Sequence, residues 1–178
     1  MNLVLIGYRC SGKTSVGKYL AGKLARDFID TDVLIEENAG SSIERIIAGD
    51  GWEHFRKIEK MVIEKVSLED NQVIATGGGV VLDEGNVKNL KRNGFIVWLK
   101  GRAGVLKERM EREHRLGRIR PSLTGSDPLM EIDRVLTSRT PYYRKAANLT
   151  VDTGTVSIRS VATSILKALP ESWVTFKG

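Results

Sequence analysis

The chain has 178 residues, of which 41% are apolar and 28% are charged. These values are ordinary for one folded domain with a hydrophobic core, and they exclude a disordered chain as the first interpretation. The net charge of +6 is compatible with anionic small molecules, a membrane surface or nucleic acid as partners. Because no basic and aromatic binding module accompanies the charge, we expect no nucleic-acid partner. The single cysteine, Cys10, excludes an internal disulfide.

No segment predicts a membrane anchor or export. Residues 1–7 lack the positively charged region of a signal peptide. No apolar run approaches the roughly 20 residues that span a bilayer. We therefore expect a cytoplasmic, monomeric protein with no membrane partner.

Short apolar runs alternate with segments of helical periodicity, which is typical of βα units around a parallel sheet. The expected strands are 3–6, a short strand ending near 28–29, 73–75, 95–99 and 149–151. Apolar stripes or composition place the expected helices around 16–24, from 54 through 66, at about 103–115, around 129–136 and at 158–169, where Pro170 ends the last one. The pattern predicts an α/β protein with one domain over 1–170 and a short tail over 171–178.

A glycine-rich loop follows the first expected strand and precedes a helix. It reads Gly7-Tyr8-Arg9-Cys10-Ser11-Gly12-Lys13-Thr14 and matches the G-x-x-x-x-G-K-[ST] pattern of a P-loop. Glycines let successive backbone N–H groups point at phosphate oxygens, and the helix start adds a positive dipole end. Lys13 would reach the terminal phosphates, and the Thr14 hydroxyl would bind Mg²⁺. We interpret Cys10 as a small residue tolerated in the loop. The loop predicts binding of a nucleoside triphosphate.

Two carboxylates, Asp30 and Asp32, follow the second expected strand. A Mg·ATP site needs a carboxylate near the metal, and a second carboxylate could hold or deprotonate a substrate hydroxyl. Asp32 could equally be the N-cap of a helix beginning at Val33. Spacing alone leaves both interpretations open.

Four further features could contact an anionic substrate or have a simpler explanation. Arg56, at the start of an expected amphipathic helix, could clamp a carboxylate, or it could be a solvated arginine. Gly77-Gly78-Gly79 after the third strand could allow close approach of a ligand, or it could be a flexible turn. Arg139 could be an ordinary surface arginine. A basic stretch that includes Arg109 and Arg120 could be a solvated face or a lid over transferred phosphates at about 110–125.

The combination of motifs resembles the shikimate kinases over nearly the whole chain, from Leu3 to about Leu169. Besides the P-loop and Asp-x-Asp, the resemblance is carried by Phe-Arg-x-x-Glu at 55–59, Thr-Gly-Gly-Gly at 76–79, Arg-Pro at 120–121 and Arg-x-Pro-x-Tyr at 139–143. The sequence has Ser122 where the family commonly has leucine. The resemblance implies a three-layer αβα P-loop kinase fold with a five-stranded parallel sheet, similar to nucleoside monophosphate kinases. It also implies Mg²⁺-dependent transfer of the ATP γ-phosphate to the 3-hydroxyl of shikimate.

The resemblance also implies a role for each matching residue. Lys13, Asp32 and Arg120 would be catalytic, Thr14 and Asp30 would serve the Mg²⁺ site, and Arg109 would stack on adenine. ATP would contact Gly7, Cys10, Ser11, Gly12, Lys13, Thr14, Ser15, Arg109 and Arg120. Shikimate would contact Asp32, Arg56, Gly78, Gly79 and Arg139.

Other functions remain compatible with parts of the sequence. A gluconate kinase of the same fold would not need both Arg56 and Arg139. A regulatory nucleotide-binding module would turn ATP over slowly without a partner. The sequence lacks the Asn-Lys-x-Asp segment that reads guanine, which argues against GTP. A basic nucleic-acid binder would show strongly salt-dependent binding.

Overall fold

A computed structural model describes residues 1–116, 123, 125 and 127–173 of the protein. The centre of the fold is a five-stranded parallel sheet with the order β2-β3-β1-β4-β5. Its strands are β1 (Asn2–Ile6), β2 (Asp27–Asp30), β3 (Gln72–Ala75), β4 (Gly94–Lys100) and β5 (Leu149–Asp152). The expected α/β class and five-stranded parallel sheet are therefore confirmed.

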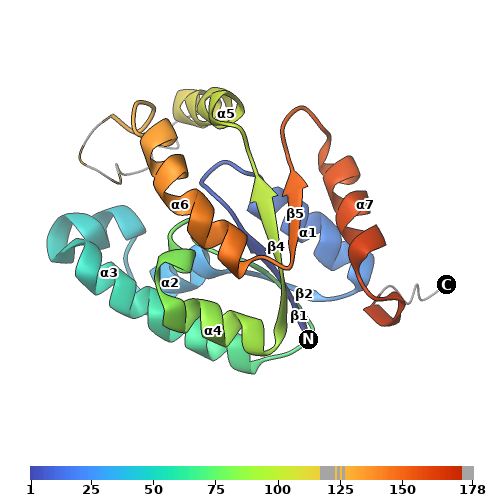
Figure 1. The fold of residues 1–178 in the computed structure, drawn as a ribbon. Coiled ribbons are helices and arrows are strands. Elements are labelled where there is room, and N and C mark those ends of the chain that lie inside the picture. The colour runs from blue at the N-terminus through green and yellow to red at the C-terminus, as the bar shows by residue number, and fades with distance from the viewer. Residues whose placement is uncertain (117–122, 124, 126, 174–178) are drawn as a thin grey trace.

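Helices cover both faces of the sheet and produce the expected three layers (Figure 1). One face carries α1 (Lys13–Leu24) and α7 (Ile158–Ala168). The other face carries α2 (Thr31–Ala39), α3 (Ile43–Leu68), α4 (Glu84–Arg92) and α6 (Ile132–Ala146). Helix α5 (Ala103–Arg115) follows β4, and short 3₁₀ helices occur at η1 (Val80–Leu82) and η2 (Glu171–Trp173).

The alternation of side chains along β1 explains why this strand is apolar without interruption. Leu3 and Leu5 enter the core beneath α1 and α7, whereas Val4 and Ile6 enter the core beneath α3 and α6. All four side chains have no exposed surface. A strand covered on both faces needs apolar residues at every position, and burial of this surface is the main favourable term in folding.

Several boundaries differ from the sequence-based expectation. Helix α4 was not expected, α2 begins at Thr31 rather than at the Val33 start that one interpretation of Asp32 allowed, and β2 extends to Asp30. Helix α3 begins at Ile43 rather than near His54. Gly51 interrupts it with φ 80° and ψ 175°, and the helix expected from the apolar stripe corresponds to the part after this kink. Helix α6 begins at Ile132, because Leu129 belongs to a preceding turn in which the Asp127 carboxylate accepts the Leu129 N–H.

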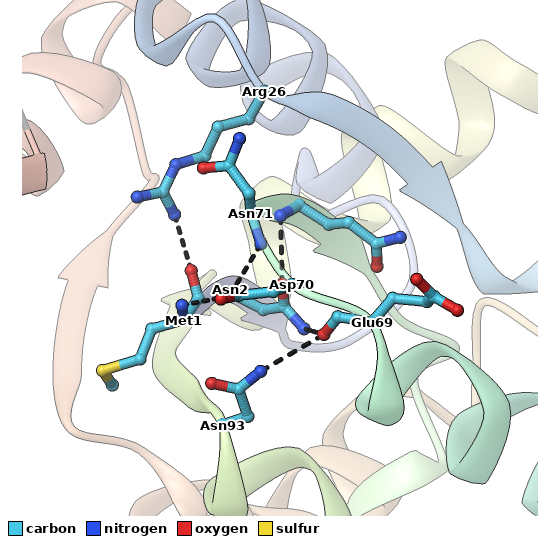
Figure 2. Close-up of polar contacts among 8 residues, drawn as sticks. Met1, Asn2, Arg26, Glu69, Asp70, Asn71 and Asn93 are labelled. Carbon is cyan, nitrogen blue, oxygen red and sulfur yellow. Dashed lines mark hydrogen bonds and ion pairs between the residues drawn. The ribbon is translucent and has the colours of Figure 1, made fainter.

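A polar network ties the amino end of β1 to its two neighbouring strands (Figure 2). Asn2 is 2% exposed. Its Nδ2 donates to the Glu69 carbonyl at 2.8 Å, and its Oδ1 accepts the Gln72 N–H at 3.0 Å. Asn93 donates to the same Glu69 carbonyl and accepts the Asn2 N–H at its own carbonyl. A buried side-chain amide thus satisfies backbone groups where the strands begin.

Candidate active site

A cavity of about 1000 Å³ opens beyond the carboxyl ends of the strands, where ligands bind in open α/β sheets. Its walls come from the P-loop, from the starts of α1 and α2, from the turn after β3 and from α3, α5 and α6. Nearly all predicted site residues in the described part of the chain line it. They are Cys10, Ser11, Gly12, Lys13, Thr14, Ser15, Asp30, Asp32, Arg56, Gly78, Gly79, Arg109 and Arg139. Gly7 is buried behind these residues.

The P-loop connects β1 to α1 in a tight curve. A β-carbon at Gly7, whose φ is 145°, would lie 2.5 Å from the Leu99 carbonyl oxygen, so no other residue fits there without displacement. Gly12 caps α1 in a left-handed conformation with φ 95°. Lys13 Nζ donates to the carbonyls of Gly7 (2.8 Å) and Tyr8 (2.9 Å). Those bonds hold the ammonium group against the loop, where terminal phosphates bind in P-loop proteins.

Thr14 and Asp30 place two oxygen donors side by side at the start of α1. Thr14 Oγ1 donates to Asp30 Oδ2 at 2.9 Å. Hydroxyl and carboxylate oxygens are the ligands that Mg²⁺ prefers, and Mg²⁺ usually keeps several waters and binds substrate phosphates besides. The pair therefore fits a Mg²⁺ site shared with a nucleotide.

The structure distinguishes the two aspartates. Asp30 is the N-cap of α2, since its Oδ1 accepts the Asp32 N–H at 3.2 Å. The interpretation of Asp32 as the cap is therefore wrong, because the helix begins two residues earlier than Val33. The Asp32 carboxylate instead points toward the glycine turn: its Oδ1 lies 2.9 Å from the position of a β-carbon at Gly77.

Arg56 lies against the glycine turn and is held by a buried carboxylate. Its Nη1 donates to Glu59 Oε2 at 2.6 Å, and the Glu59 side chain is 1% exposed. The rings of Trp52 and Phe55 lie 5.5 Å and 5.0 Å from the guanidinium carbon. Burial raises the pKa of Glu59, and the Arg56 charge and hydrogen bond partly oppose that rise. Arg56 is therefore an oriented cation, which a merely solvated arginine would not be.

Arg139 reaches the same turn from α6. It is 8% exposed, so its interpretation as a surface arginine is wrong, because its helix packs over the carboxyl ends of the strands. Arg139 Nη1 donates to the Gly78 carbonyl at 3.2 Å, and the Tyr143 hydroxyl donates to the same oxygen at 2.5 Å. Burial raises the pKa of Tyr143 to about 12, so this hydroxyl stays protonated and remains a donor near neutral pH.

Arg109 extends from α5 between the P-loop and the β5–α7 connection. Its Nη2 donates to the carbonyls of Thr153 (2.5 Å) and Gly154 (2.9 Å), and its Nη1 is 3.4 Å from the Cys10 carbonyl oxygen. The guanidinium is thus held by the carbonyls of Cys10, Thr153 and Gly154 in the wall of the cavity. Arg118, Arg120, Pro121 and Ser122 lie outside the described residues, as do all of 117–122 and residue 124 of the lid expected at about 110–125.

Sequence reasoning assigned no role to four residues that support the site. Glu59 orients Arg56, and its i,i+3 spacing on one helix was a usable signal. Trp52 precedes Arg56 by four residues on α3, so their contact also had a local signal, whereas only the packing of α6 brings Tyr143 to Gly78. Glu131, considered below, offered no signal in the sequence.

In the part of the chain that the structure describes, no helix is long and apolar enough to cross a membrane.

A P-loop on a parallel sheet, with an oxygen-donor pair and arginines around one cavity, defines an ATP-dependent P-loop kinase of a small molecule. A family model described as shikimate kinase matches residues 9–170. A shikimate kinase of Symbiobacterium thermophilum is 42% identical over 173 residues, covering 96% of this chain and 97% of that protein. One from Caldanaerobacter subterraneus is 42% identical over 167 residues, covering 94% and 95%.

A solved structure carries the same likeness into three dimensions. The shikimate kinase from Acinetobacter baumannii, described in complex with shikimate, superposes with a TM-score of 0.85 at 34% identity and covers 93% of this chain and 90% of that chain. The chain belongs to the shikimate kinase family.

Proposed function

We propose that the protein transfers the γ-phosphate of ATP to the 3-hydroxyl of shikimate in this cavity. The products would be ADP and shikimate 3-phosphate, which serves chorismate and aromatic amino-acid synthesis. One observation carries the proposal: Arg56 and Arg139, from helices far apart in the sequence, meet the glycine turn beside the P-loop. A β-carbon at Gly78 would lie 3.4 Å from the backbone nitrogen of Arg9 and from the carbonyl oxygen of Gly7, so the glycine turn contacts the backbone of the P-loop.

The nucleotide would lie along the P-loop and α5. Backbone N–H groups of the loop and Lys13 would hold the phosphates, and Arg109 would face the adenine end. Thr14 and Asp30 would hold Mg²⁺, which neutralises phosphate charge when bound. No covalent intermediate is needed, because phosphoryl transfer is promoted chiefly by positioning and by stabilisation of charge.

Shikimate would lie at the glycine turn. A guanidinium matches a carboxylate with two parallel hydrogen bonds, so Arg56 and Arg139 suit the carboxylate of the substrate. Asp32 would accept hydrogen bonds from shikimate hydroxyls and hold, or accept, the proton of the attacking one. Gly78 and Gly79 would contact shikimate through their backbone. Arg120 stays a prediction as the arginine near the transferred phosphate, and a monomeric, cytoplasmic single-domain enzyme stays a prediction as well.

The proposal is tested by ADP release from Mg·ATP with shikimate, with gluconate as the alternative acceptor. We expect release that depends on shikimate and none above background with gluconate. Release with gluconate alone would move the acceptor assignment while leaving the P-loop intact. No release with either compound, despite nucleotide binding, would favour a regulatory nucleotide-binding protein.

Variants of the arginines separate acceptor binding from nucleotide binding. Arg139→Ala and Arg56→Ala should each raise the KM for shikimate by about tenfold or more, since each removes a charged hydrogen-bond donor. The KM for ATP should change little. Arg134→Ala, an exposed position on the same helix as Arg139, and Lys57→Ala, beside Arg56 and 70% exposed, are matched controls. Lys13→Ala should reduce turnover at least about 10²-fold; substantial remaining turnover would contradict its role at the phosphates.

A further inference from the structure

Glu131 carries a buried carboxylate outside the site described above. The residue precedes α6 and is 2% exposed. Both of its carboxylate oxygens lie 2.9 Å from the Leu123 nitrogen, so the carboxylate accepts this backbone N–H in a forked arrangement. Its Oε1 lies 3.7 Å from Arg9 Nη2. The Glu131 side chain is 1% exposed and the Arg9 side chain is 9% exposed. A charge removed from water to this degree requires such partners.

Arg9 and Leu123, which both contact Glu131, belong to the wall of the nucleotide cavity. Arg9 is a P-loop residue, and both Arg9 and Leu123 line the cavity. Leu123 also packs against a cluster formed by Tyr8, Leu106, Met110, Ile132 and Val135. Glu131 itself does not line the cavity. Its carboxylate therefore joins two wall segments from behind: the P-loop after β1 and the chain at Leu123.

A helix-start glutamate has a simpler explanation, because an acidic group there is favoured by the helix dipole. That explanation does not account for the direction of the side chain. Glu131 makes no capping bond to its own helix. Its carboxylate turns instead to Leu123 and to Arg9, and an exposed acidic residue would have served the dipole equally well.

We propose that Glu131 is a positioning residue for nucleotide binding, acting through Arg9 and Leu123. The P-loop binds phosphates with backbone N–H groups whose directions must be set before the ligand arrives, since ordering them on binding would weaken affinity. The ion pair restrains the first half of the loop, and the forked hydrogen bond keeps Leu123 packed beside Tyr8. The inference rests on nucleotide binding at the P-loop, and it does not depend on which acceptor is phosphorylated.

The test is the affinity of the full-length protein for a fluorescent ADP analogue, with wild type, Glu131→Gln and Glu131→Asp. Glutamine keeps the shape and one acceptor oxygen but removes the charge that faces Arg9. We expect about tenfold weaker ADP binding and a similar rise in the KM for ATP. Losses of about this size are typical when a residue that orients a ligand-binding residue is changed. The KM for shikimate should stay within about twofold. Aspartate keeps the charge and should recover part of the affinity.

Glu84→Gln is the matched control, since Glu84 also starts a helix and pairs with a cation, Lys145, at 3.0 Å, but does not line the cavity. It should leave ADP binding unchanged. Urea unfolding of each variant separates positioning from stability. A lower unfolding free energy with unchanged ADP affinity would overturn the proposal, and so would equal rises in both KM values.

Arg9→Met tests the same connection from the other side and remains informative if Glu131→Gln does not fold. It should also weaken ADP binding. If Glu131 acts through Arg9, the variant that carries both Glu131→Gln and Arg9→Met should bind ADP about as weakly as whichever single variant has the lower ADP affinity. Independent, multiplicative losses would overturn the link. Absence of shikimate-dependent turnover in the wild type would instead contradict the proposed function. It would leave this test intact, because ADP binding would remain measurable.

Discussion

The guanidinium of Arg56 occupies the space where a side chain at Gly79 would begin. A β-carbon at position 79 would lie 2.3 Å from Arg56 Nη2 and 2.7 Å from Nη1. Such distances are far inside van der Waals contact, so a side chain at position 79 could be accommodated only if the Arg56 guanidinium moved. The glycine turn thus serves the site partly by leaving room for the arginine.

Gly79→Ala should displace Arg56 and weaken shikimate binding. Misplacement of a binding group by about 1 Å can cost about 10²-fold in rate, and we expect a loss of that order in kcat/KM for shikimate, with the KM for ATP changed much less. Steady-state kinetics with each substrate varied in turn would check this. Gly22→Ala is the control: nothing lies within 4 Å of the added carbon, and the helix should gain roughly 0.5–1 kcal/mol in stability. Unchanged shikimate kinetics in Gly79→Ala would contradict the predicted displacement.

The burial of Glu59 should be visible in the pH dependence of stability. Burial raises the pKa of Glu59 in the folded state, with the Arg56 charge opposing. A raised pKa in the folded state means that folding favours the protonated carboxyl. Its contribution to stability is therefore complete below the unfolded pKa and is lost as pH rises through the folded pKa. The stability of wild type minus that of Glu59→Gln should accordingly fall as the pH rises.

Urea unfolding of both proteins at several pH values would measure this difference. Glu53→Gln on the same helix is an informative control, because its side chain is exposed and a hydrogen bond from Lys57 lowers the pKa of Glu53. A lowered pKa gives the opposite sign, with stability lost as pH falls, and the effect at this exposed site should be small. A Glu59 difference that grows with pH would refute the prediction.

Asp30→Asn should separate the metal role of Asp30 from its capping role. Asparagine caps helices as well as aspartate does, so the stability should change little. The charge beside Thr14 Oγ1 would be lost, and the Mg²⁺ concentration for half-maximal rate should rise by about tenfold or more. Rates measured against Mg²⁺ at fixed ATP would test this, and chelation with EDTA should abolish turnover. Asp27→Asn, at the exposed opposite end of β2, should leave the Mg²⁺ requirement unchanged.

Asn2→Ala should destabilise the protein without changing its catalysis. The substitution removes a buried amide that bonds the Glu69 carbonyl and the Gln72 N–H, and it leaves both groups without that partner (Figure 2). The Glu69 carbonyl keeps its bond from Asn93, whereas the Gln72 N–H loses its acceptor, and a group left unsatisfied costs about 1–3 kcal/mol, which is the loss we expect by urea unfolding. Asn38→Ala, which removes one exposed bond to Leu34, should stay within about 0.5 kcal/mol. A change below that value in Asn2→Ala, or altered KM values, would contradict the prediction.

Features with local causes could be predicted from the sequence. The P-loop needs only its own glycines, Lys13 and the following helix, and β1 needs only an unbroken apolar run. Helix α5 was expected at 103–115 and is found at Ala103–Arg115. Helix α4 was not expected, and a helix after Asp32 was only one of two interpretations: α2 is short, and α4 buries few apolar residues, so neither shows a clear periodic stripe.

The class of fold, the phosphate loop and the types of residue that an anionic acceptor needs could thus be predicted from the amino-acid sequence. Which of those residues meet could not be predicted, because it depends on tertiary packing. Asp30 rather than Asp32 caps α2, because the helix begins where β2 ends. Arg139 is buried beside Gly78, and Glu131 faces Arg9, because α6 crosses the carboxyl ends of the strands. Spacing along the chain encodes contacts within one helix or turn, whereas contacts between distant elements follow from strand order and helix packing, which depend on the whole apolar core.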